Sequence, residues 1–215
     1  MKRVAVYGAS GFGREVMPLV RHQLSIAADT AHLVFIDDSA NAQTVNGHSI
    51  LPYARWLALE AIERWVCIAI ADSRIRQKLA EQCAADSVKF FEARASNVFE
   101  SDGLIIGEGG VFSPFVTLNA NSTIGKHFHA NLYSYVGHDC TIGDFVTFAP
   151  GVKCNGNVVI EDHAYIGTGA IIKQGTPDKP LVIGRGAVVG MGAVVTKDVA
   201  AGTTVVGNPA RPLVR

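Results

Sequence analysis

A six-residue repeat in the second half of the chain constrains its fold more than any other feature. Every sixth residue from position 106 to position 172 is apolar, without a break. A period of six is too short for a helical solenoid, and it is typical of a parallel β-helix. In such a fold three short strands make a coil of about 18 residues, and each strand turns one apolar side chain towards the axis. The inward residues are then Ile106, Phe112, Leu118, Ile124, Ala130, Val136, Ile142, Phe148, Cys154, Ile160, Ile166 and Ile172.

The repeat is interrupted once, at residues 173–182, which we interpret as an insertion. We expect the period to resume at Ile183, Val189, Val195 and Ala201. Glycine and small residues are expected at the tight corners of the coils. An excursion from a regular scaffold often folds over a bound ligand, so the insertion is a candidate ligand contact.

The first hundred residues follow a different pattern, in which apolar strands alternate with helices. We predict strands at 4–7, 33–36 and 66–70, and helices at 14–23 and 73–83. Continuous apolar runs between helices favour a small parallel sheet covered on both faces. The sequence therefore predicts a Rossmann-like α/β domain at residues 1–100 and an all-β parallel β-helix at residues 101–215.

Composition excludes several classes of protein. The 19 basic and 19 acidic residues balance, so charge gives no reason to expect nucleic acid or a membrane surface as a partner. No apolar run approaches the length of a membrane span, and the glycine turn at residue 8 interrupts any secretory signal, so we expect a cytoplasmic protein. Cys67, Cys83, Cys140 and Cys154 lack metal-ligand spacing and are expected to be buried thiols.

Both halves resemble one known family. Residues 142–144, 166–170, 188–199 and 206–210 are similar to hexapeptide-repeat acyltransferases. The glycine turn at residues 7–16 resembles the group that contains sialic-acid O-acetyltransferases and nucleotide-4-amino-sugar N-acetyltransferases. This resemblance implies a left-handed β-helix, a homotrimer with active sites between subunits, acetyl-CoA as acyl donor and a nucleotide sugar as acceptor.

His138 and Asp139 are the candidate catalytic pair. Histidine can take a proton near neutral pH, and an adjacent carboxylate can orient its ring. From the residues alone a structural corner histidine is an open alternative, whereas the resemblance implies a general base. Gly156 lies one coil further on, and its N–H is either an oxyanion donor or part of an ordinary turn. Zinc-binding β-helices carry two histidines five residues apart, a pattern this chain lacks, so no metal is expected.

The resemblance also implies two ligand sites. Positions matching the family's coenzyme A contacts are Gly167, Thr168, Gly190, Gly192, Lys197 and Pro209. The N-terminal turn leads from a strand into a helix, which suits a phosphate group, although its spacing is not that of a dinucleotide site. The residues expected to hold the nucleotide sugar are Gly8, Ser10, Gly11, Phe12, Gly13, Arg14, Asp37, Asp38 and Asp72.

Two departures from the family pattern bear on the acceptor. Many relatives carry histidine where this chain has Phe12 and Thr147. Our leading hypothesis is acetyl transfer from acetyl-CoA to the amino group of a nucleotide-linked 4-amino sugar for surface glycan synthesis. One alternative is O-acetylation of a sugar hydroxyl, such as that of sialic acid. A second alternative is a nucleotide-sugar-binding protein without catalytic activity.

Overall fold

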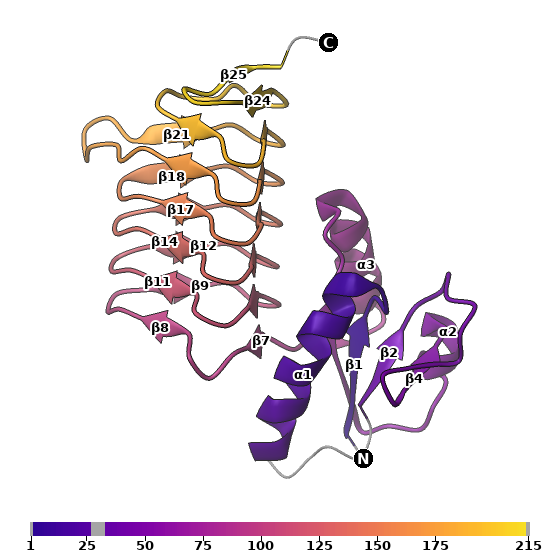
Figure 1. Ribbon diagram of the computed structural model, residues 1–215. Coiled ribbons are helices and arrows are strands. Elements are labelled where there is room, and N and C mark those ends of the chain that lie inside the picture. Colours follow the sequence, from indigo (N-terminus) through magenta and orange to yellow (C-terminus); the bar gives the residue numbers. More distant parts are fainter. Residues whose placement is uncertain (1, 27–32, 214–215) are drawn as a thin grey trace. The chain divides into compact units, whose positions relative to one another are not determined.

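The computed structural model describes residues 2–26 and 33–213, and its contacts divide into two compact units. The first unit is Met1–Arg94 and the second is Ala95–Arg215. The domain boundary expected at residue 100 therefore falls inside the second unit. Each unit is described by itself below, with its elements labelled in Figure 1.

The first unit is built on a sheet with strand order β3-β4-β2-β1-β5-β6, in which only the β3–β4 pair is antiparallel. Its strands are β1 (Lys2–Tyr7), β2 (Leu33–Ile36), β3 (Thr44–Val45), β4 (His48–Leu51), β5 (Glu63–Ile68) and β6 (Lys89–Phe90). Its helices are α1 (Gly11–Ile26), α2 (Tyr53–Leu57) and α3 (Ser73–Ala85). The short strand β7 (Ala93–Arg94) follows them. The central strands are parallel and apolar, as the sequence predicts.

Four of the five predicted elements of this unit differ from the prediction at their ends. Strand β1 begins at Lys2 rather than at residue 4, and α3 ends at Ala85 rather than at residue 83. Strand β5 covers Glu63–Ile68 rather than 66–70, and α1 begins at Gly11 rather than at residue 14. The early start of α1 depends on a close approach between the helix and the end of β1. A Cβ atom added at Gly13 would lie 1.8 Å from the carbonyl oxygen of Gly8. Only glycine fits there. Gly11 and Gly13, which the sequence assigns to a turn, therefore belong to the helix.

The second unit is a parallel β-helix with three walls of stacked short strands. The first wall contains β10 (Val111–Phe112), β13 (His129–Ala130), β16 (Thr147–Phe148), β19 (Tyr165–Ile166), β22 (Val188–Val189), β24 (Thr204–Val206) and the antiparallel β25 (Arg211–Pro212). The second wall contains β8 (Phe99–Glu100), β11 (Thr117–Leu118), β14 (Tyr135–Val136), β17 (Lys153–Cys154), β20 (Ile171–Ile172) and β23 (Val194–Val195). The third contains β9 (Ile105–Ile106), β12 (Thr123–Ile124), β15 (Thr141–Ile142), β18 (Val158–Ile160) and β21 (Leu181–Ile183).

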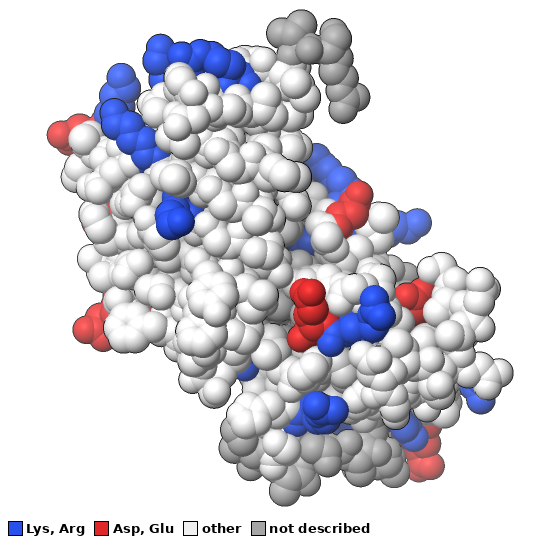
Figure 2. Space-filling view, in the orientation of Figure 1, with Lys and Arg blue, Asp and Glu red and all other residues white. Residues whose placement is uncertain are grey.

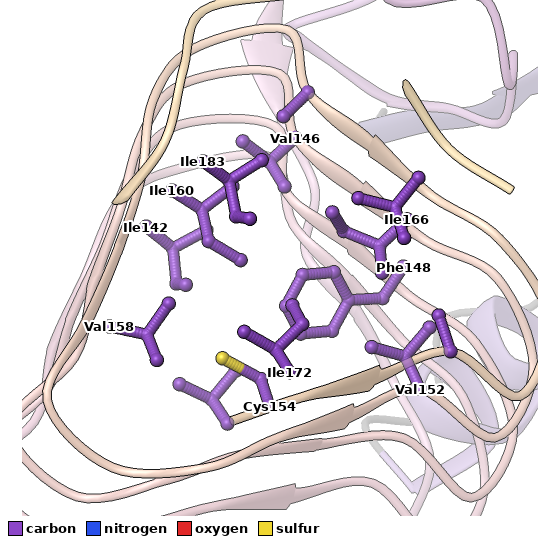
Figure 3. Packing of buried hydrophobic residues seen from close by; sticks show 14 of the residues in the cluster. Ile142, Val146, Phe148, Val152, Cys154, Val158, Ile160, Ile166, Ile172 and Ile183 are labelled. Atoms are coloured by element: carbon purple, nitrogen blue, oxygen red, sulfur yellow. The ribbon is translucent and has the colours of Figure 1, made fainter. Parts of the chain in front are cut away.

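The register between coils follows the predicted period. Val136 pairs with Cys154, and Ile142 pairs with Ile160, each 18 positions along the chain. Looking along the axis, the apolar side chains of the three walls converge on a common core (Figure 3). The predicted inward residues from Phe112 to Ile172 are all buried, while Ile106 in the first coil is partly exposed. The six-residue period is therefore the packing period of the core.

The corners of the coils confirm one expectation only in part. Glycine holds the left-handed backbone position at several corners, such as Gly151 and Gly169. At other corners larger side chains hold it, including Phe115, His127, Tyr133, Phe145 and His163. Rings at successive corners stack on one another: His127 on Phe145 at 5.1 Å, and Phe145 on His163 at 5.4 Å between ring centroids. Stacking between coils offsets the steric cost of a positive φ, which residues with a Cβ otherwise avoid.

The last coil corrects another expectation, because Ala201 is exposed and does not enter the core. Val199 takes the inward place above Ile183, with which it forms a parallel bridge, so the corner after β23 is shorter than the repeat predicts. The period then continues to Val205, which pairs with Val189. The insertion at 173–182 is present as a protrusion between β20 and β21, closed by a bridge between Thr176 and Lys179.

The surface of the β-helix is poor in charge on the face seen in Figure 2, and lysine and arginine side chains gather towards its C-terminal coils. Large apolar side chains remain exposed on this unit, among them Phe99, Ile105, Phe115, Tyr133 and Met191. No helix within residues 2–26 and 33–213 has the length and hydropathy needed to cross a membrane. All four cysteines are buried and form no disulfide.

Candidate active site

His138 and Asp139 form a hydrogen-bonded pair at the corner after β14. The Nδ1 atom of His138 lies 2.7 Å from Oδ2 of Asp139, and about half of each side chain is exposed. A carboxylate can only accept a hydrogen bond, so Nδ1 carries the proton. In the neutral ring Nε2 is then the unprotonated nitrogen, which is the state a general base needs.

The backbone around this pair is shaped by close contact with the next coil. Asp139 has a φ of 54°, a left-handed conformation that aspartate tolerates better than most residues. A Cβ atom added at Gly137 would lie 2.5 Å from the backbone of Asn155 and Gly156, so only glycine lets the coils stack here. The pair is thus fixed by a turn that has little freedom to rearrange.

Gly156 lies directly against the imidazole of His138, one coil further along. A Cβ atom added at Gly156 would lie 2.5 Å from both Cε1 and Nε2 of that ring. The N–H of Gly156 donates to no acceptor among the residues that the structure describes. An N–H without an internal partner, next to the basic nitrogen, is positioned to meet an oxyanion formed beside His138.

A hollow of about 350 Å³ surrounds these groups. It is lined by Ser101, Asn119, Ala120, Tyr135, Gly137, His138, Asn155, Gly156 and Gln174. Gln174 belongs to the insertion that the sequence marks as a candidate ligand contact, but Ser101, Asn119, Tyr135 and Asn155 match no motif and were missed. For the two asparagines spacing was the available signal, since Asn119 and Asn155 lie one coil before and one coil after Gly137.

Tyr135 and Asn155 form a second polar pair in the hollow. The hydroxyl of Tyr135 donates to Oδ1 of Asn155 at 2.8 Å, and Nδ2 of Asn155 donates to the carbonyl of Ile172 at 2.7 Å. Burial raises the pKa of the Tyr135 hydroxyl, and the nearby Cys154 thiol adds to the effect. The hydroxyl therefore stays protonated near neutral pH, and as the donor to Asn155 it fixes that amide.

Most of the residues expected to contact coenzyme A lie on a different edge of the β-helix from His138. Gly167, Thr168, Gly190 and Gly192 occupy corners that follow strands β19 and β22 of the first wall. His138 and Gly156 occupy corners that follow strands of the second wall. One copy of the chain does not bring these two edges together.

Two further positions complete the expected cofactor set. Pro209 follows β24 of the first wall and so belongs to the edge of the glycines. Lys197 follows β23 of the second wall, on the edge of His138. Lys197 also lines a hollow of about 570 Å³, to which the 173–182 insertion contributes Lys173 and Lys179. Gln174 lines both this hollow and the one around His138, so the two are neighbours.

The N-terminal glycine turn is held by Asp37 at the end of β2. The N–H of Ala9 donates to Oδ2 of Asp37 at 3.0 Å, while Ser39 donates to Oδ1 through its backbone N–H and its hydroxyl. Burial opposes ionisation of this carboxyl group, but the hydrogen bonds from Ala9 and Ser39 outweigh it and hold the pKa of Asp37 below its usual value. The expected ligand contact is therefore also the support of the turn.

The other predicted carboxylates have partners within their own unit. Asp38 accepts hydrogen bonds from the Tyr7 hydroxyl and from the backbone N–H of Tyr53. Asp72 caps the N-terminus of α3, where it accepts from the N–H groups of Arg74 and Ile75. Asp72 thus has a helix-capping role that the sequence analysis did not assign to it.

The remaining turn residues lie around the start of α1. Gly8 has a φ of 112° and lies against Ala69 at the end of β5, so a side chain there would be strained. Ser10, Gly11 and Arg14 are exposed, and Gly13 is buried against Gly8.

The two residues that depart from the family pattern both lie in regular secondary structure. Phe12 is half-buried in the first turn of α1, and Thr147 is buried on β16 of the first wall. Thr147 therefore lies on a different wall from the strand that leads to His138. In the part of the chain that the structure describes, no group of three or more His, Cys, Asp and Glu side chains is arranged to hold a metal ion.

Comparisons with known proteins decide the family. Residues 3–83 match the model of the PglD N-terminal domain. GDP-perosamine N-acetyltransferase from Escherichia coli O157:H7 is 48% identical over 216 residues, which cover all of this chain and 98% of the relative. The chain belongs to the nucleotide-amino-sugar N-acetyltransferases. It is an acetyl-CoA-dependent acyltransferase, as the sequence predicts.

Solved structures agree with this assignment. WeeI from Acinetobacter baumannii AYE is 57% identical with a TM-score of 0.97, covering 99% of this chain and all of the other. The acetyltransferase domain of PglB from Neisseria gonorrhoeae, solved with acetyl coenzyme A, is 30% identical with a TM-score of 0.84 and covers 98% of each chain. The predicted fold class, an α/β domain followed by a hexapeptide-repeat β-helix, is confirmed.

Proposed function

We propose that this enzyme transfers the acetyl group of acetyl-CoA to the amino group of a GDP-linked amino sugar of the perosamine type. The observation that carries the proposal is the His138–Asp139 pair set against the N–H of Gly156. The full-length similarity to a GDP-perosamine N-acetyltransferase supports the choice of acceptor. The product would feed surface glycan synthesis.

In this mechanism His138 takes a proton from the attacking amine through Nε2. Asp139 accepts from Nδ1 and stabilises the imidazolium that forms. The amine nitrogen bonds to the thioester carbon, and the negative charge that develops on the carbonyl oxygen is met by the N–H of Gly156. Collapse of the tetrahedral intermediate breaks the carbon–sulfur bond, and the proton on His138 passes to the departing thiolate.

The position of the cofactor residues supports a homotrimer. Within one chain, Gly167 and Gly190 lie on one edge of the three-walled β-helix, and His138 lies on another edge. If a second copy places its glycine edge beside the His138 edge of the first, the thioester reaches the base. Each active site would then need two subunits, with acetyl-CoA between them and the enzyme acting in the cytoplasm.

In the first unit, the turn supported by Asp37 and the start of α1 would hold the diphosphate of the nucleotide sugar. Backbone N–H groups at a helix N-terminus favour anions, and the exposed Arg14 adds a positive charge. Asp37, Asp38 and Asp72 would act mainly by shaping this binding surface, because their carboxylates already accept hydrogen bonds from the protein.

The experiment that tests the function is the release of coenzyme A thiol from acetyl-CoA with a panel of acceptors. The panel contains GDP-, UDP- and dTDP-linked amino sugars, together with free sialic acid. We expect fast release with the GDP-linked amino sugar and loss of that release in His138→Ala. Release with sialic acid alone would replace this proposal with O-acetylation. Nucleotide-sugar binding without any release would support the non-catalytic alternative.

The two-subunit site has its own test. His138→Ala removes the base from one edge, while Thr168→Trp places a bulky ring at an exposed position on the other edge. Each variant alone should be inactive. After co-refolding, mixed trimers should recover part of the activity, because an intact His138 edge can face an intact Thr168 edge. Mixtures that stay inactive, in assemblies shown to be mixed, would contradict a shared site.

A further inference from the structure

The proposed reaction leaves one hydrogen-bonding requirement without a partner. A neutral primary amine presents two N–H bonds, and His138 can accept only one of them through Nε2. The second N–H needs an acceptor when bound acetyl-CoA and sugar exclude water, because an unmatched polar group in such a site weakens binding and transfer. A hydroxyl acceptor has a single O–H and makes no such demand.

Asn119 has the required free oxygen, and its orientation is fixed. Its backbone N–H and its side-chain Nδ2 both donate to the carbonyl of Val136, at 3.0 and 2.8 Å. The amide cannot be reversed, since Oδ1 would then face a carbonyl oxygen. Among residues 2–26 and 33–213, nothing donates to Oδ1 of Asn119. The side chain lines the same hollow as His138 and is partly exposed there.

The repeat supplies an internal comparison that isolates this feature. Two coils further on, Asn155 makes the same bond to the backbone, but its Oδ1 is already bound by the hydroxyl of Tyr135. Phe99 precedes Asn119 by the same number of residues as Tyr135 precedes Asn155. Phe99 lies on β8, two strands from Tyr135 on the same wall. Phe99 has no hydroxyl, so the oxygen of Asn119 stays open.

The location of Asn119 suits contact with the reacting amine. It follows Leu118, which pairs with Val136, so Asn119 lies one coil before Gly137, the residue preceding His138. Neighbouring strands of a sheet lie about 4.8 Å apart. Gly156 lies against the imidazole from the next coil. The hollow thus offers an acceptor from the coil before His138 and an oxyanion donor from the coil after it.

From this arrangement, and resting on the proposed function, we infer that Asn119 Oδ1 accepts the second N–H of the acceptor amine and selects amines over hydroxyls. The nitrogen lone pair is then directed at the thioester carbon. One N–H proton passes to His138 and on to the thiolate, while the N–H held by Asn119 remains on the product amide. Asn119 is therefore a catalytic residue that touches substrate.

The test compares three variants with wild type. Asn119→Ala removes the acceptor. Phe99→Tyr leaves Asn119 in place but supplies the hydroxyl that should cap its oxygen, as Tyr135 caps Asn155. Phe99→Leu is the matched control, because it alters the same exposed residue without adding a hydroxyl. The readouts are kcat/KM for the amino sugar, inhibition by the nucleotide sugar carrying hydrogen in place of the amine, acetyl-CoA affinity and the thermal midpoint.

We expect roughly tenfold to hundredfold lower kcat/KM in Asn119→Ala and in Phe99→Tyr, as the loss of one hydrogen bond in the transition state implies. Phe99→Leu should match wild type. Inhibition by the analogue without the amine and acetyl-CoA affinity should change in none of them. Wild-type kcat/KM in Phe99→Tyr and Asn119→Ala would overturn the inference. If Asn119→Ala fails to fold, Phe99→Tyr alone decides.

The proposed function and this inference fail in different ways. A wild-type enzyme that transfers acetyl to no amino sugar contradicts the proposed function and this inference with it. A wild-type enzyme that transfers acetyl to the amine, together with unaffected Asn119 and Phe99 variants, contradicts the inference alone.

Discussion

Replacing Gly156 by alanine tests the geometry of the proposed catalytic corner most sharply. The added methyl carbon would lie 2.5 Å from Cε1 and Nε2 of His138 and 2.9 Å from Cδ2. A comfortable contact between such atoms needs about 3.5 Å. The imidazole must therefore move by about 1 Å, away from the position in which Nδ1 meets Asp139. A displacement of this size at reacting groups can lower the rate about a hundredfold.

The cost of Gly156→Ala should appear in kcat and not in folding. The backbone of Gly156 does not need a positive φ, and the side chain of His138 is half exposed and can rotate. We expect kcat for coenzyme A release to fall about a hundredfold, with a thermal midpoint close to that of wild type. Wild-type kcat in Gly156→Ala would refute the placement of Nε2 beside Gly156.

A control substitution separates steric damage from catalytic damage. A Cβ atom added at Gly110 would lie 2.6 Å from the ring of Phe112, which is fully buried in the β-helix core. Gly110→Ala should therefore lower the thermal midpoint, while the folded enzyme keeps its kcat. If Gly110→Ala lowered kcat as much as Gly156→Ala, the effect at Gly156 would not be local.

Three further predictions follow from the contacts. Asp139→Asn should lower kcat by roughly tenfold or more without changing the acetyl-CoA KM, because the imidazolium of His138 loses its charged partner, as initial rates will show. Asp72→Ala should destabilise the protein by about 1 kcal/mol in urea unfolding, whereas Asp72→Asn should keep the helix cap. Because the pKa of Asp37 is lowered in the folded protein, its contribution to stability is present above about pH 4 and is lost as the pH falls through the folded pKa. Asp37→Ala should therefore make the free energy of unfolding depend less on pH in this acid range, as unfolding curves at several pH values will show. An unchanged dependence on pH would contradict this prediction.

Much of the fold could be predicted because the β-helix repeats its packing rule at fixed spacing. The inward residues and the placement of Gly156 over His138 both follow from a coil of 18 residues. The end of the repeat could not be found this way, since the short corner that brings Val199 into the core leaves Ala201 exposed. The corners held by aromatic and histidine side chains could not be predicted either, because ring stacking between coils overrides the usual preference for glycine there.

The candidate site could be predicted where a motif marked it and not where only spacing did. The choice of His138–Asp139 as the candidate acid–base pair follows from chemistry and resemblance. The role proposed for Asn119 could not be predicted from the sequence, because it depends on which of its atoms the backbone already binds. Asp72 shows the opposite case: an aspartate just before a predicted helix is a capping signal that the expected ligand role obscured.

The measurement that tests the central claim most directly is identification of the acetylated product. Purified enzyme is incubated with acetyl-CoA and GDP-perosamine, and the product is examined by mass spectrometry before and after treatment with hydroxylamine, which cleaves esters but not amides. The account predicts a single added acetyl group that survives the treatment, formed by wild type and at most at a trace rate by His138→Ala. A hydroxylamine-sensitive product, or full activity in His138→Ala, would contradict it.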